Sequence, residues 1–79
     1  MTSHMRGKIN FAIKRYQLRN RRDINAVLSS RKEYSAALNH LANKAAEADM
    51  VEAFEKISQL LNDIDEGKEP ELLEPEVAA

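Results

Sequence analysis

The sequence contains no cysteine and no tryptophan, and has only two glycines and two prolines among 79 residues. Without cysteine the chain forms no disulfide, and a structural zinc site is disfavoured. Its uninterrupted apolar runs are two or three residues long, which is too short to span a membrane. A cysteine-free chain without a signal-type apolar run is typical of a cytoplasmic protein.

The length allows one domain, whose core is small. Residues 1–4 are interpreted as a cloning-site remnant, because Ser3-His4-Met5 has that character. Residues 5–67 are expected to form a single helical domain, since helix-favouring residues are abundant and glycine is scarce. Residues 68–79 carry both prolines and four glutamates, which predicts a disordered acidic tail.

The last helix is predicted from a narrow apolar stripe that begins near Met50 and ends before Gly67. Asp49 is expected to cap its start. The preceding segment repeats apolar residues by three and four, like the inner positions of a coiled coil. The two stripes are out of phase, which predicts a tight turn at 47–49. The expected core or dimer contacts are Ile24, Val27, Arg31, Tyr34, Leu38, Leu41, Phe54, Ile57, Leu61 and Ile64.

The first segment carries the same stripe through Ile9, Ile13 and Tyr16, with one irregular step near Asn20. This pattern allows one long helix, but the polar run that ends at Asp23 favours a break near residues 20–23. The predicted fold is therefore all-α: an antiparallel helical hairpin with an N-terminal helical extension. Because a core of this size contributes only a few kcal/mol, we expect a homodimer that forms a four-helix-bundle or coiled-coil-like assembly.

The net charge of −1 conceals a steep gradient along the chain. Seven basic residues and no acidic one lie between Arg6 and Arg22, whereas the segment from Glu47 to Glu76 is strongly acidic. Two large apolar residues of the first helix point away from its core stripe into this basic surface. The predicted partner-binding residues are Phe11, Lys14, Arg15, Leu18, Arg19, Arg21 and Arg22.

This surface has several interpretations. Another protein could use Phe11 and Leu18 as anchors, with the arginines contacting an acidic surface. Nucleic acid is the alternative partner, bound through phosphates in a salt-dependent way. A second subunit could also simply bury Phe11 and Leu18 in the core of a dimer.

Catalytic and cofactor signatures are lacking. His40 has no second ligand at metal-binding spacing, and Gly7 and Gly67 do not form a phosphate-binding loop. We therefore predict a small non-enzymatic regulator or adaptor that self-associates and binds another protein, in the class of transcription or phage- and plasmid-borne regulators, with no cofactor, metal or small-molecule substrate. A nucleic-acid-binding accessory protein and a structural scaffolding subunit are the alternatives.

Overall fold

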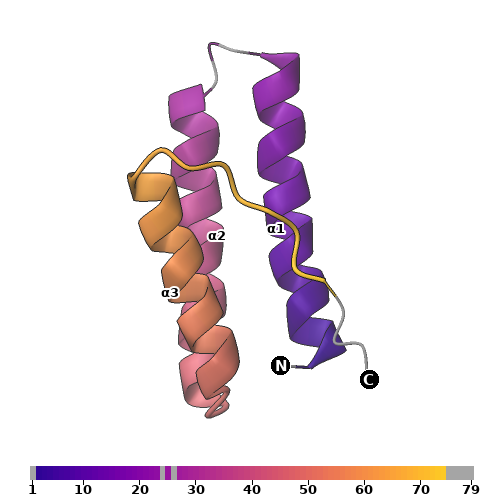
Figure 1. Ribbon diagram of the computed structural model, residues 1–79, viewed down its shortest axis with the longest axis vertical. Coiled ribbons are helices and arrows are strands. Elements are labelled where there is room, and N and C mark those ends of the chain that lie inside the picture. Colours follow the sequence, from indigo (N-terminus) through magenta and orange to yellow (C-terminus); the bar gives the residue numbers. More distant parts are fainter. Residues whose placement is uncertain (1, 24, 26, 75–79) are drawn as a thin grey trace.

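The computed structural model describes residues 2–23, 25 and 27–74. Within these residues the chain forms helices and no strand, which confirms the all-α expectation. Successive helices run antiparallel, and the chain then crosses from the last helix back onto the first (Figure 1). The helices are α1 (Ser3–Arg22), α2 (Val27–Glu47) and α3 (Val51–Asp65).

The first helix is not a continuation of the second. α1 ends at Arg22, and the backbone N–H of Asn25 donates to the Asp23 carboxylate, which forms a local turn. Across this turn, the buried Ser30 hydroxyl donates to the side-chain carbonyl of Asn20. The segment expected as an N-terminal extension therefore folds back and packs along α2, because the polar turn reverses the chain (Figure 1).

The second turn lies at 47–49, as predicted, but Asp49 has a different role from the expected one. The N–H of Met50 donates to the Ala45 carbonyl at 2.8 Å, and the N–H of Asp49 donates to the Ala46 carbonyl at 3.2 Å. This bond pair, with φ of 55° at Asp49, is a Schellman motif that ends α2. Asp49 thus occupies a position that usually holds glycine, and α3 begins without a side-chain cap. Gly67, with φ of 81°, ends α3 through the same bond pattern.

The core is a seam in which α2 contacts both neighbours. The stripe predicted on the first helix is buried, and Met5 extends it. Small side chains on α2 allow α3 to approach closely. The buried apolar residues are Met5, Ile9, Ala12, Ile13, Tyr16, Tyr34, Leu38, Leu41, Ala42, Ala45, Ala53, Ile57, Leu60 and Ile64.

The buried face of α3 is rotated from the predicted stripe. Leu60 is buried and Leu61 only partly so, whereas Phe54 is 42% exposed and lies outside the core of this chain. The rotation has a physical reason: α3 packs on α2 and also touches α1, so its buried face turns toward the space between these two helices and leaves Phe54 outside it. Val27 and Arg31 are half-buried, and Ile24 lies outside the described residues.

The C-terminal segment also differs from the expected disordered tail. Residues 68–74, which we call the strap, run in an extended conformation across α1 (Figure 1). Pro70 is buried, and Leu73 packs against the core cluster. The strap stays in place because the few contacts between α1 and α3 leave apolar surface that these two residues cover. The rest of the predicted tail, residues 75–79, lies outside the described residues.

The left-handed conformation at Asp49 makes a direct prediction about stability. Replacing Asp49 by glycine removes the steric cost of this conformation and should stabilise the fold by about 0.5–1 kcal/mol. Asp49→Val should destabilise it by about 1–2 kcal/mol, since a β-branched side chain suffers most there. Urea denaturation of both variants measures these effects. Equal stabilities for the two variants would contradict the geometry of this turn.

Candidate protein-binding groove

The structure places the predicted partner-binding residues on three parts of α1. Phe11 and Leu18 lie on its outward crest, with exposed fractions of 67% and 53%. Their spacing of seven residues keeps them on one side of the helix. Neither side chain belongs to the core of this chain, so both are accessible anchors in the monomer.

The basic residues divide between the two edges of α1. Arg15 and Arg19 line the side next to α2. Lys14 and Arg21 lie one helical turn after Asn10 and Gln17, on the edge next to the strap. Arg22 is exposed in the last turn, where a positive charge complements the helix dipole. The single basic face of the sequence analysis is therefore two charged edges separated by an apolar crest.

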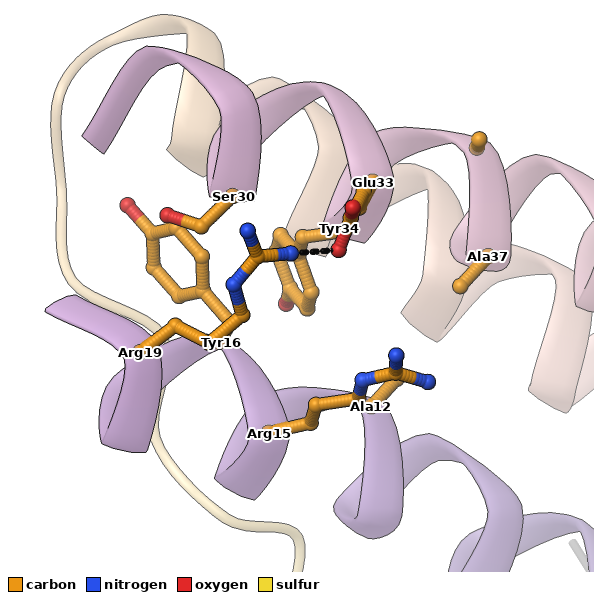
Figure 2. Close-up of a pocket in the computed structure, with 9 residues that line it drawn as sticks. Ala12, Arg15, Tyr16, Arg19, Ser30, Glu33, Tyr34 and Ala37 are labelled. Atoms are coloured by element: carbon orange, nitrogen blue, oxygen red, sulfur yellow. Dashed lines mark hydrogen bonds and ion pairs between the residues drawn. The ribbon is translucent and has the colours of Figure 1, made fainter. Parts of the chain in front are cut away.

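A groove runs between α1 and α2 on the side away from the strap. Its upper part, with a volume of about 310 Å³, lies beside the first turn and is drawn in Figure 2. Arg19 forms an ion pair with Glu33 of α2 there (Figure 2). The hydrogen bond from Arg19 lowers the pKa of the Glu33 carboxyl below its ordinary value, and the charges of Arg19 and Arg15 act in the same direction. Arg19 thus already has an acidic partner within the chain.

The floor of this upper part is aromatic. The rings of Tyr16 and Tyr34 stack with centroids 4.8 Å apart. Burial raises the pKa of the Tyr34 phenol above its ordinary value, with Tyr16 and Asp63 adding to the increase. The Tyr34 hydroxyl has no hydrogen-bond partner among the described residues. The Tyr34 phenol therefore stays protonated at neutral pH, and its ring packs in the core.

The lower part of the groove is larger, with a volume of about 580 Å³. Small residues (Gly7, Ala12 and Ala37) line it, and Phe11 stands along its edge. A Cβ atom built on Gly7 would meet nothing within 4 Å, so this wall of α1 is open. No acidic side chain lines this part among the described residues, whereas the basic side chains that do are Lys8, Arg15 and Lys44, with His4 and His40 beside them.

The sequence analysis missed several residues of this groove. Lys8, Ala37, His40 and Lys44 come from two helices, and only the antiparallel packing of α1 on α2 brings them together. The available signal was weak: a Gly7 one turn before Phe11 on a helix otherwise free of glycine. Since α1 was expected as an extension, its pairing with α2 was not considered.

The described part of the chain contains no candidate metal-binding cluster and no candidate membrane span. The described residues hold no group of three or more His, Asp or Glu side chains that could bind a metal ion. None of the helices in the described part of the chain is long and apolar enough to cross a membrane. Arg31, one of the expected core or dimer contacts, is half-buried, and its Nε atom has no hydrogen-bond partner among the described residues; a dimer contact there stays a prediction.

Comparison with known proteins gives no further assignment. No family model matches this chain, and neither a curated protein nor a solved structure matches it. The function must therefore be argued from the chemistry of the surface alone.

Phe11 and Ile13 offer a matched pair for testing which surface is core. Ile13 is fully buried, and its replacement by alanine should cost about 2–5 kcal/mol of unfolding free energy. Phe11 is mostly exposed, so Phe11→Ala should change stability by less than about 0.5 kcal/mol. Thermal or urea unfolding of the dilute chain measures both. A large loss of stability for Phe11→Ala would show that a second subunit buries this residue.

Proposed function

We propose that this chain is a non-enzymatic cytoplasmic adaptor that binds another protein in the groove between α1 and α2. The bound segment is an acidic amphipathic helix. It lies between the two helices, with its apolar face on Phe11 and the small residues and its carboxylates near the basic rim. The observation that carries this proposal is the lower groove, which joins a small-residue wall, an exposed Phe11 and basic side chains on both helices.

The size and chemistry of the groove favour a helix. Small residues on facing helices allow a third backbone to approach closely, in the manner of helix-in-groove recognition. Such a helix would complete a bundle on the side of α2 opposite the one that α3 covers. Lys8, Arg15 and Lys44 select acidic partners and speed their association. Exposed Phe11 supplies the kind of aromatic anchor that dominates binding energy.

Nucleic acid is the competing partner, because the same basic residues could contact phosphates. The apolar character of the crest argues against it. Phe11 and Leu18 are exposed at the centre of the surface, where they would take phosphates out of water without offering them a hydrogen bond or an opposite charge. The two partner classes also differ in which charges matter, and this difference can be measured.

Charge reversal on the two edges of α1 tests the proposal. The probe is a labelled synthetic helix with leucines on one face and glutamates on the other, titrated at physiological salt with anisotropy as readout. Lys8→Glu with Arg15→Glu should weaken binding at least about tenfold, because both residues line the groove. Lys14→Glu with Arg21→Glu makes the same change in net charge outside the groove and should weaken binding by less than about threefold.

Two outcomes would reject the groove as the binding site for an acidic helix. One is a probe that binds the Lys8/Arg15 variant as tightly as the original chain. The other is an equal loss from both double variants combined with salt-sensitive binding of a mixed-sequence DNA duplex, which would favour the nucleic-acid alternative. Phe11→Ala separates apolar from purely electrostatic binding and should also reduce affinity for the probe.

We include self-association in the proposal, through a second surface. Val51 is 66% exposed beside the half-exposed Phe54 at the start of α3, and both line an apolar hollow with Ala45 and Ala46. Phe54 was expected as a core or dimer contact. Because it lies outside the core of this chain, we propose it as a dimer contact. An adaptor of this kind would pair copies at the α2–α3 turn and leave each groove free.

Sedimentation equilibrium tests this dimer contact. Phe54→Ser should shift the chain towards monomer by at least about tenfold in dissociation constant, because it removes a large apolar contact. Leu28→Ser, at a more exposed apolar position at the start of α2, is the control and should leave association unchanged. A monomer at every concentration for the original chain would remove self-association from the proposal.

A further inference from the structure

The strap is held on α1 by side-chain amides that bond to its backbone. Asn10 Nδ2 donates to the Leu73 carbonyl at 2.9 Å, and the Leu73 N–H donates to Asn10 Oδ1 at 2.7 Å. Gln17 Nε2 donates to the Pro70 carbonyl at 2.9 Å. Asn10 thus satisfies both backbone polar groups of one strap residue, as a neighbouring β-strand would.

The spacing of these two amides matches an extended peptide. Asn10 and Gln17 are seven residues apart, which is about 10.5 Å along a helix. Pro70 and Leu73 are three residues apart, which is about 9–10 Å along an extended or polyproline II chain. The strap runs antiparallel to α1, so each amide meets the residue opposite to it (Figure 1). An extended segment therefore fits this edge of α1 in one register.

Side-chain contacts add specificity at the same two positions. Pro70 is buried and Leu73 packs on the core, whereas Glu71, Leu72 and Glu74 point to solvent. A period of three residues is the repeat of a polyproline II segment, which places every third side chain on one face. Proline also lowers the entropy lost when such a segment is ordered.

The charge on this edge suits an acidic ligand. Arg6 and Lys14 lie one helical turn on either side of Asn10, and Arg21 lies one turn beyond Gln17. The strap carries Glu69, Glu71 and Glu74. Of the basic residues of α1 that do not line the α1–α2 groove, only Arg22 lies outside this edge. The site lies on the opposite edge of α1, so it does not rest on the function proposed for that groove.

The link between α3 and the strap allows the strap to leave. α3 is closed by its own bonds at Gly67 and Lys68, so its end does not depend on the strap. All three hydrogen bonds that hold the strap reach its backbone carbonyl and N–H groups. A site that reads backbone and two apolar side chains accepts any extended peptide with those two side chains.

We infer that Asn10 and Gln17 mark a binding site for extended acidic peptides with proline and leucine three residues apart. The strap occupies this site in the free chain. The ligand is such a segment of a partner protein, and it displaces the strap on binding. The chain therefore carries a built-in competitor for its own peptide site, which raises the ligand concentration needed for binding.

The test uses a labelled synthetic peptide with the sequence of residues 68–74. It is titrated into the full chain and into a variant whose strap is weakened by Pro70→Ser with Leu73→Ser. The weakened variant should bind the peptide at least about tenfold more tightly than the original chain, because its own strap competes less. Adding Asn10→Ala to that variant should reduce the affinity at least about tenfold, since two hydrogen bonds are lost.

Matched controls make the result specific. Asn39→Ala removes an exposed amide of α2 and should leave peptide binding unchanged. A peptide with serine in place of its proline and second leucine should not bind. If the double strap variant loses helical structure by circular dichroism, Leu73→Ser alone serves in its place. The inference is overturned if the weakened strap variant fails to bind at millimolar peptide, or if Asn10→Ala leaves binding intact.

The charge reversal at Lys8 and Arg15 distinguishes the peptide site from the α1–α2 groove. That variant should still bind the strap peptide once the strap is weakened, because its substitutions lie on the other edge of α1. Loss of strap-peptide binding in that variant would merge the two sites into one and overturn the separate peptide site. If this variant loses only the binding of the helical probe, the result bears on the groove and leaves the peptide site unaffected.

Discussion

Burial of α2 on two sides is the constraint on which the rest of the structure depends. Leu38 and Ala45 are fully buried between neighbours that touch each other at few positions. α1 and α3 therefore both pack on α2 and make little contact with each other, so apolar surface remains between them. The strap covers that surface with Pro70 and Leu73. Without the close packing of α1 and α3 on α2, the groove would lose the residues that α2 contributes. Pro70 and Leu73 would then have no apolar surface to cover.

This arrangement gives α1 two working edges. One edge faces α2 and forms an open groove with basic residues around small ones, and the other faces the strap and holds it through Asn10 and Gln17. Six of the seven basic residues of the first segment divide equally between these edges, and those in the last turn complement the helix dipole. Charge that looked like one surface in the sequence thus supports two different contacts.

The sequence predicted the elements whose signals are local. The stripe of Ile9, Ile13 and Tyr16 and the turn at 47–49 follow from helical periodicity and its change of phase. Features set by tertiary contacts could not be predicted in that way. The rotation that buries Leu60 and exposes Phe54 depends on how α3 packs against α2 and α1. The position of the strap depends on amides that lie 63 and 53 residues earlier, which composition alone cannot indicate.

The most direct test of the central claim is amide chemical-shift mapping of the isotope-labelled full chain with the acidic amphipathic helix. The account predicts that shifts concentrate at the α1–α2 groove, around Gly7, Phe11, Arg15, Ala37 and Lys44, while residues 70–73 stay unchanged. Shifts spread evenly over every basic residue of α1, or centred on the strap, would contradict a groove that recognises a helix between α1 and α2.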